Sequence, residues 1–276
     1  MLLWGMHGLK SLLGAFLVAI LVCGFVLAGA FHFGTVKASA DVIGIINSDT
    51  TWTKANSPYT LTGPVGVAKG VTLTIEAGVT VNGAVIEMNG TLVARGSSVD
   101  PIHFNSVNIM FAESSNNWNE QTGSGSIIEN AIISDTQINI NNTSPKINGN
   151  HIAGSILVFY EGAPVISNNI IETNRYSAIQ IDSGPTVVLN NTIITNQVNY
   201  GIIANGPSSL SVPTPVILNN IVKGSGGKFG ITAGTVHISD NVISGYQTGI
   251  YASGPAIIER NLIVNNYMGI DERVGR

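Results

Sequence analysis

A short pattern with asparagine in a fixed position recurs through the chain. It reads "APVISNNIIETN" from Ala163, "GPTVVLNNTIITN" from Gly184 and "GTVHISDNVISG" from Gly234. An apolar residue lies three positions before the asparagine and another lies two positions after it. Successive asparagines are 20, 19, 22, 29, 21 and 20 residues apart, and a period of this length indicates a stacked repeat architecture. The aligned residues are Asn130, Asn150, Asn169, Asn191, Asn220, Asn241 and Asn261.

Each repeat also carries a second apolar block, followed by a turn rich in glycine and proline. The block reads "YGIIA" from Tyr200, "FGITA" from Phe229 and "TGIYA" from Thr248. The one long step between asparagines contains "GPSSLSVPTP", which is typical of a loop. Segments this short and this rich in β-branched residues are poor helices and good strands. We therefore expect an all-β chain, a single parallel β-helix of about ten coils.

The fixed asparagine follows from this architecture. Equivalent strands of neighbouring coils are about 4.8 Å apart, so equivalent asparagines stack into a ladder. An amide carries both a donor and an acceptor, so each member can bond its neighbour and also satisfy the backbone of a turn. The sequence thus predicts a structural ladder at the edge of an apolar core.

The first forty residues differ from the rest. Residues 11–33 contain no lysine, arginine, aspartate or glutamate, and as a helix they are long enough to cross a bilayer. Lys10 precedes them, and "ASA" at Ala38–Ala40 resembles a signal-peptidase site. Residues 1–40 are therefore predicted to be a signal peptide or a membrane anchor. Either form would export residues 41–276 to the cell surface or the extracellular space.

The charge of the chain excludes one class of partner. The formal net charge is −4, and without residues 1–40, which hold Lys10 and Lys37, 10 basic residues face 16 acidic ones. A basic surface for nucleic acid is therefore not expected.

Residues 50–106 contain further short strands with glycine turns. The pattern "SPY…GVTLTIEAGVTV…GTLVARG…PIHF" in this stretch resembles the opening coils of secreted right-handed parallel β-helix proteins of the pectate-lyase-like superfamily. The resemblance covers about residues 50–270. It divides residues 41–276 into opening coils at about 50–110 and asparagine-ladder repeats at about 123–276. It implies the fold and leaves the function open, because one fold hosts many activities.

Enzymes in this superfamily would require sites that are hard to find here. Its hydrolases use clustered aspartates with a nearby histidine motif, and its lyases use an acidic calcium cluster with a basic residue. No two aspartates of residues 41–276 are adjacent, and Gly-His-Gly is absent. His151 and His237 occupy different positions in their repeats, so a shared metal site is not expected. We assign no catalytic residue, metal ligand or cofactor, although carboxylates of neighbouring coils could still pair.

Aromatic residues recur just before the second apolar block. Stacked coils would place them along one ridge, either as rings that cover a turn or as a platform for sugar faces. Gln180, Asp182, Gln247 and Asp271 could add hydrogen bonds. The ridge consists of Tyr176, Tyr200, Phe229 and Tyr267.

The expected function is a non-enzymatic module of the cell surface that binds a polysaccharide or envelope glycan or forms surface structure. The alternative is a polysaccharide lyase or glycoside hydrolase. A third reading is a self-associating stalk, because the sequence ends at "MGIDERVGR", midway through a coil without a capping helix. Either the chain is a fragment or something else covers that end.

Overall fold

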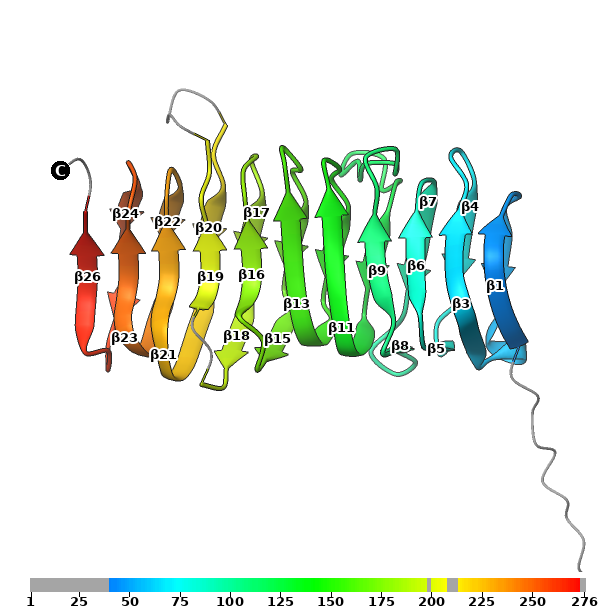
Figure 1. Ribbon diagram of the computed structural model, residues 1–276, viewed down its shortest axis with the longest axis horizontal. Helices are drawn as coiled ribbons and strands as arrows, with labels where there is room; N and C mark the ends of the chain where they lie inside the picture. Colours follow the sequence, from blue (N-terminus) through cyan, green and yellow to red (C-terminus); the bar gives the residue numbers. More distant parts are fainter. Residues whose placement is uncertain (1–39, 198–199, 208–212, 274–276) are drawn as a thin grey trace, which may run out of the picture. The chain divides into compact units, whose positions relative to one another are not determined.

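The computed structural model describes residues 40–197, 200–207 and 213–273. These residues form a parallel β-solenoid of about eleven turns. Figure 1 shows the turns stacked in sequence order from β1 to β26. The predicted all-β parallel β-helix is confirmed, with about one turn more than expected. The predicted N-terminal helix and part of the "GPSSLSVPTP" loop lie outside the described residues. No helix within the described ranges is long and apolar enough to cross a membrane.

The strands form two sheets along the solenoid. Sheet B has ten strands and takes one short strand from each turn. These are β2 (Thr50–Trp52), β4 (Thr72–Ile75), β7 (Thr91–Arg95), β10 (Ile127–Glu129), β12 (Lys146–Asn148), β14 (Val165–Ser167), β17 (Val187–Leu189), β20 (Val216–Leu218), β22 (His237–Ser239) and β24 (Ile257–Glu259).

Sheet A has sixteen strands, and several of its long strands bend around a corner of the coil. A short 3₁₀ helix, η1 (Lys54–Asn56), lies between β2 and β3. The strands of sheet A are β1 (Ala40–Ile46), β3 (Tyr59–Val67), β5 (Thr80–Asn82), β6 (Val85–Met88), β8 (Ile102–Asn105), β9 (Asn108–Phe111), β11 (Ala131–Asn141), β13 (His151–Phe159), β15 (Ile170–Thr173), β16 (Ser177–Ile181), β18 (Thr192–Thr195), β19 (Tyr200–Ala204), β21 (Ile221–Ala233), β23 (Val242–Ala252), β25 (Leu262–Ile263) and β26 (Met268–Glu272).

The core consists of columns of β-branched residues that point inward from every turn. Ile166, Val188 and Ile217 pair in register on sheet B and are fully buried. Ile171 and Ile193 do the same on sheet A. Side chains alternate between the two faces of a strand, so this register gives each turn one buried and one outer face. The two apolar positions around each asparagine are therefore core positions.

The glycine of the second apolar block is required by the stacking. A Cβ on Gly230 would lie 2.5 Å from the Cγ2 of Ile243 and 2.6 Å from the backbone oxygen of Gly249 in the next turn. Both distances are shorter than real Cβ atoms tolerate. Any side chain at this position would push neighbouring turns apart.

An asparagine closes the corner after sheet B in six successive turns, and all but Asn261 are buried. The Oδ1 of Asn191 accepts hydrogen bonds from the backbone N–H and the Nδ2 of Asn169, both at 2.9 Å. The Nδ2 of Asn191 also donates to the backbone oxygen of Ile166 in the preceding turn. These bonds satisfy both the amide and the corner's backbone, which would otherwise be buried without partners. The six residues are Asn150, Asn169, Asn191, Asn220, Asn241 and Asn261.

Asn130 was predicted to belong to this ladder, and that prediction was wrong. The residue that donates its backbone N–H to Asn150 Oδ1, at 2.9 Å, is Ala131. Asn130 lies one position earlier and has a φ of 50°, the left-handed conformation that Asn168 and Asn190 adopt in later turns. Asparagine tolerates this backbone better than most residues. Asn130 therefore forms the turn and does not extend the stack.

Candidate functional site

Four aromatic rings from successive turns lie in a row beside the corner that leads into the second strand of sheet A. The ring centroids of Tyr176 and Tyr200 are 4.8 Å apart, and those of Tyr200 and Phe229 are 5.7 Å apart. Tyr251 continues the row at 4.7 Å from Phe229. These four residues form the aromatic row. Strand register pairs Tyr200 with Phe229 directly. Tyr176 lies one residue before the partner of Tyr200, and Tyr251 lies three residues after the partner of Phe229.

Tyr267 was expected in this row, but the structure puts Tyr251 beside Phe229 instead. The register pairs Phe229 with Thr248 and Thr248 with Met268. Tyr267 therefore lies one residue before the aligned position, and its side chain is 92% exposed. Tyr251 comes from the outer face of the same block, three residues after Thr248. The sequence alignment missed it because it occupies a different position in its repeat.

The rings of the row direct most of their faces toward one another. Phe229 and Tyr251 stack with an interplanar angle of 26°, and the Nζ of Lys228 lies 5.0 Å from the centroid of Phe229. Tyr176, at the start of the row, is 58% exposed. A hydrogen bond with the Tyr200 side chain raises the pKa of Tyr176 above its ordinary value. The inner rings thus cover the corner, and Tyr176 is the most exposed ring of the aromatic row.

A pocket of about 300 Å³ is lined in part by Arg175, the residue before Tyr176. Its lining residues come from the same corner in neighbouring turns: Asp135, Ala153, Gly154, Glu172, Thr173, Asn174, Arg175 and Asn196. Arg175 Nη2 donates to Asp135 Oδ1 at 2.9 Å. His151 Nε2 lies 3.8 Å from Glu172 Oε1. The pocket therefore presents carboxylate, guanidinium and amide groups, and the exposed Tyr176 directly follows its lining residue Arg175 in the chain.

The polar side chains expected near the row have different surroundings. Gln180 donates to Asp182 Oδ1 at 3.1 Å, so these two residues are already paired. Asp271 pairs in register with Tyr251 and lies 3.3 Å from Arg273. Gln247 is exposed on the stretch of β23 that leads to Thr248. Only Asp271 is thus brought next to a ring of the row by strand register.

One buried hydroxyl next to the row lacks a partner. Thr232 pairs in register with Tyr251, and its Oγ1 is buried without a hydrogen bond among the described residues. Leaving a buried hydroxyl unpaired costs about 1–3 kcal/mol. The row therefore lies over a locally unfavourable position.

A charged cluster on sheet B contains Arg260, Glu259, Asp240 and His237. Arg260 Nη1 lies 2.9 Å from Glu259 Oε1, and Arg260 Nε donates to Asp240 Oδ1 at 2.8 Å. The Arg260 guanidinium holds the pKa of Asp240 below its usual range. His237, followed by Arg260, does the same for the pKa of Glu259. Within the described ranges, no three histidine, cysteine, aspartate or glutamate side chains are grouped as a metal site would require.

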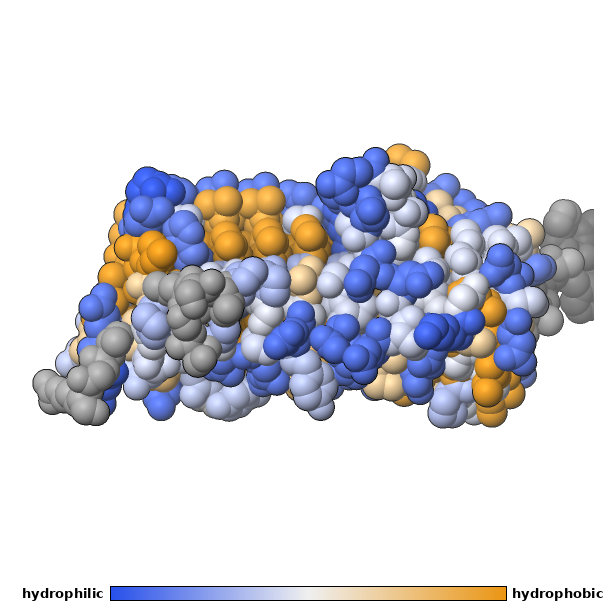
Figure 2. Space-filling model, turned by 90° about the horizontal axis from the view of Figure 1, so that it is seen from above, coloured by the Kyte–Doolittle hydropathy of each residue, from blue (hydrophilic) through white to orange (hydrophobic). Residues whose placement is uncertain are grey.

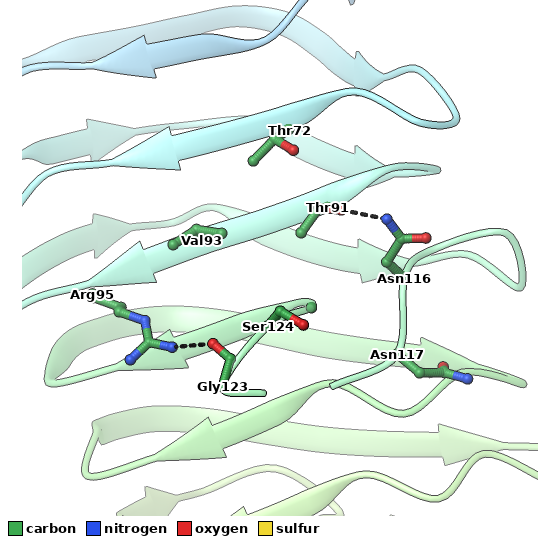
Figure 3. Close-up of a pocket in the computed structure, with 9 residues that line it drawn as sticks. Thr72, Thr91, Val93, Arg95, Asn116, Asn117, Gly123 and Ser124 are labelled. Carbon is green, nitrogen blue, oxygen red and sulfur yellow. Dashed lines mark hydrogen bonds between the residues drawn. The ribbon is translucent and has the colours of Figure 1, made fainter. Parts of the chain in front are cut away.

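A second hollow lies on sheet B, where sequence inspection found nothing. A loop formed by residues 112–126 stands over the outer face of β4 and β7 and encloses a cleft of about 620 Å³. Figure 3 shows Thr72, Thr91, Val93 and Arg95 along one side of the cleft and Asn116, Asn117, Gly123 and Ser124 along the other. The loop does not repeat along the chain, so the periodicity carried no signal for it.

Comparisons with known proteins add no family to this description. No family model matches the chain, and neither curated proteins nor solved structures give a match. The fold is that of a parallel β-solenoid, and functional arguments depend on the surface of this molecule alone.

Proposed function

We propose that this chain is an exported, non-enzymatic β-solenoid that binds a glycan at Tyr176 and the pocket beside it. The observation that carries the proposal is the exposed Tyr176 directly after Arg175, which lines a pocket together with Asp135 and two asparagines. Sugars present apolar faces that stack on aromatic rings and hydroxyls that bond to carboxylates, amides and guanidinium groups. A rigid solenoid holds these groups in place before the ligand arrives, which lowers the entropic cost of binding.

The rest of the aromatic row supports this site mechanically. Tyr200 and Phe229 pack between Tyr176 and Tyr251, so the first ring is held in a defined orientation. An extended glycan would enter the pocket at Tyr176 and follow the corner along the solenoid axis. Binding would then depend far more on Tyr176 than on the inner rings.

The test is a glycan array on the full chain, followed by titration with the best oligosaccharide. Tyr176→Ala should weaken binding about tenfold, since an aromatic contact is worth about 0.5–1.5 kcal/mol. Tyr267→Ala is the control, because it removes a tyrosine that is even more exposed and lies outside the site. Thr232→Val is a second control that leaves all four rings intact. Equal binding by Tyr176→Ala and Tyr267→Ala, or no binding to any glycan, would refute the proposal.

The enzymatic alternative has a direct assay. Asp135 lies beside Arg175 and Glu172 beside His151, so both carboxylates of the pocket have a basic side chain as neighbour. A hydrolase would release new reducing ends from the bound glycan, and a lyase would release unsaturated products. The proposal expects neither product, and a signal in either assay that disappears in Asp135→Asn would replace it.

Export is the second part of the proposal and depends on residues 1–40. The apolar run 11–33 and the "ASA" at Ala38–Ala40 support it. Mass spectrometry of the N-terminus distinguishes cleavage before Asp41 from retention of Met1. Recovery of the untagged chain from the cytosol would contradict both forms.

Self-association is a further proposal for the last described turn. Leu262, Met268 and Ile270 are 56%, 42% and 43% exposed there. A stalk built end to end would bury them in the next copy. Sedimentation of the full chain should then show oligomers that Leu262→Lys dissociates, and a monomer at all concentrations would exclude the stalk.

A further inference from the structure

The loop formed by residues 112–126 is the clearest interruption of the repeat among the described turns. Strand register pairs Val93 with Ile127, so the turn between these two residues includes the loop. Lys146 pairs with Val165, and the turn between these two residues has the ordinary length of a repeat. Insertions into a repeat architecture project from one face and often form the binding face. The extra residues here fold back over sheet B and create the cleft of Figure 3.

The loop is fixed to the solenoid by hydrogen bonds at several points. Ser115 Oγ donates to the backbone oxygen of Gly90 at 3.0 Å. The backbone N–H of Trp118 donates to the backbone oxygen of Ser144 at 2.8 Å. Lys146 Nζ lies 2.7 Å from Glu120 Oε1. The wall of the cleft is therefore formed before any ligand binds, and little ordering is left to oppose binding.

The polar groups that line the cleft are mostly uncharged. Thr72, Thr91, Asn116, Asn117 and Ser124 contribute hydroxyls and amides, and Val93 contributes an apolar patch. The Nδ2 of Asn116 donates to Thr91 Oγ1 at 2.6 Å. The Oδ1 of Asn117 accepts bonds from the hydroxyl of Thr143 and the backbone of Ser144. These bonds orient the two asparagines and leave Asn116 Oδ1 and Asn117 Nδ2 without a partner within the described ranges.

The charges near the cleft are compensated within the molecule. Arg95 Nη2 donates to the backbone oxygen of Gly123 at 3.1 Å, and Arg95 Nη1 lies 3.5 Å from Glu129 Oε2. Lys146 pairs with Glu120 and holds the pKa of Glu120 below its usual value. A charged ligand would therefore gain little from this cleft and would lose its own hydration.

Trp118 adds an aromatic group behind the cleft. The guanidinium carbon of Arg95 and the Nζ of Lys146 each lie 5.2 Å from the centroid of the Trp118 indole. The indole N–H donates to Glu120. Trp118 belongs to the loop and Arg95 to β7, so their contact connects the loop side of the cleft to its strand side.

We propose that this cleft binds a neutral saccharide of about one or two sugar rings. Its volume is within the range of small-ligand sites, about 300–1,000 Å³. Neutral hydroxyls and amides match sugar hydroxyls, and Val93 gives an apolar contact for a ring face. The cleft lies on sheet B, away from the corner that holds Tyr176, and the inference does not depend on the function proposed for that corner.

The experiment is saturation-transfer NMR and calorimetric titration of the full chain with N,N′-diacetylchitobiose, cellobiose, xylobiose and digalacturonate. At least one neutral disaccharide should bind with a Kd in the millimolar range. Ser124→Trp, which fills the cleft from the loop, should weaken that binding at least tenfold. Gln121→Trp adds the same bulk at an exposed position on the same loop outside the cleft and should bind as the natural chain does.

A second filling variant keeps the test decisive if the loop variant does not fold. Thr72→Phe fills the cleft from the strand side and should also weaken binding at least tenfold. Tyr176→Ala should have no effect on the disaccharide, which separates this site from the corner site. Unchanged binding by either folded filling variant, binding of digalacturonate alone, or no binding of any disaccharide would overturn the inference.

Discussion

The corner after sheet B is built in two different ways along the same solenoid. In the last six described ladder turns an asparagine occupies it, and it is buried in all but the last of them. In the turns before them, strand register places Val79, Ile102 and Ala131 in the same column, and all three are buried. The column therefore changes from apolar to polar between Ala131 and Asn150, although the core on either side stays the same.

Corner length explains the change. β17 ends at Leu189 and β18 begins at Thr192, so only two residues turn the chain. The turns before Ala131 use longer corners, such as the one from Arg95 to Ile102, which make their own hydrogen bonds. In that corner, the backbone N–H of Asp100 donates to Ser97 Oγ at 3.0 Å. The corner at Ala131 is already short, and Asn150 of the next turn serves it. A two-residue corner has no room for such bonds, and the amide of the next turn supplies them instead. A buried polar ladder is thus needed where the corner is shortest.

The largest expected effect tests what the two regions share. Ile193 belongs to an inward column and is fully buried. Ile193→Asp should bury an unpaired carboxylate and abolish folding, and Ile86→Asp should do the same in the opening turns. Circular dichroism and Trp52 fluorescence would report the loss. A cooperative unfolding transition in either variant would show that the inward columns are misassigned.

The next effect tests whether the apolar corner accepts an amide. Ile102 is fully buried, and its neighbours in the column, Val79 and Ala131, carry no polar side-chain atom. Ile102→Asn should cost about 3–5 kcal/mol, because it loses apolar contacts and leaves an amide unsatisfied. Urea denaturation measures this loss, with Ile102→Val as the control at about 1 kcal/mol. A stable Ile102→Asn chain would mean that the two corners are interchangeable.

A third prediction concerns another buried polar group of the ladder region. Tyr246 is 3% exposed and its hydroxyl lies 2.8 Å from Thr195 Oγ1. Burial raises the pKa of Tyr246 to about 12, above its value near 10 in the unfolded chain. The contribution of the neutral phenol to the free energy of unfolding is therefore complete below pH 10, and it is lost as the pH rises from 10 to 12. The loss should reach about 3 kcal/mol.

Tyr246→Phe is the variant that isolates this effect. It should show a flatter decline in the free energy of unfolding between pH 10 and 12 than the natural chain. Parallel declines would mean that Tyr246 ionises as freely as an exposed tyrosine.

The smallest effect is expected at the exposed ion pairs of the last turns. Asp240 and Glu259 have lowered pKa values because of Arg260 and His237. The contribution of these two carboxylates to the free energy of unfolding is present above the ordinary carboxyl pKa near 4. It is lost as the pH falls through their lowered pKa values. Exposed pairs contribute little and are screened by salt. Asp240→Asn should change Tm only slightly at pH 7, and a large drop would show that these pairs hold the last turns together.

The sequence predicted the ladder because each repeat places the same residue type at the same distance from two core positions. It failed at Asn130 for an identifiable reason. Ile127 and Ile128 are both apolar, so the core position could be aligned to either, and only the pairing of Ile128 with Ile147 decides the register. A one-residue shift in such a strand exchanges its two faces.

The surface was harder to predict than the core. Tyr251 joins the aromatic row from a different position in its repeat, and only three-dimensional stacking brings it to Phe229. The loop formed by residues 112–126 has no counterpart in other repeats, so periodicity could not indicate its cleft. On the face that Figure 2 draws, hydrophobic residues gather over the C-terminal half of the solenoid. Val187, Leu189 and Leu218 on the outer face of sheet B are only partly buried, although the repeat pattern marks them no differently from core residues.

The most direct test of the corner account is the free energy of unfolding of Asn191→Leu. Leucine has nearly the shape of asparagine and is apolar, like the residues of the opening corners. The account predicts a loss of about 3 kcal/mol or more, because the backbone N–H and amide of Asn169 and the backbone oxygen of Ile166 all lose a partner. A chain with Asn191→Leu that is as stable as the natural one would show that the short corner does not need its amide.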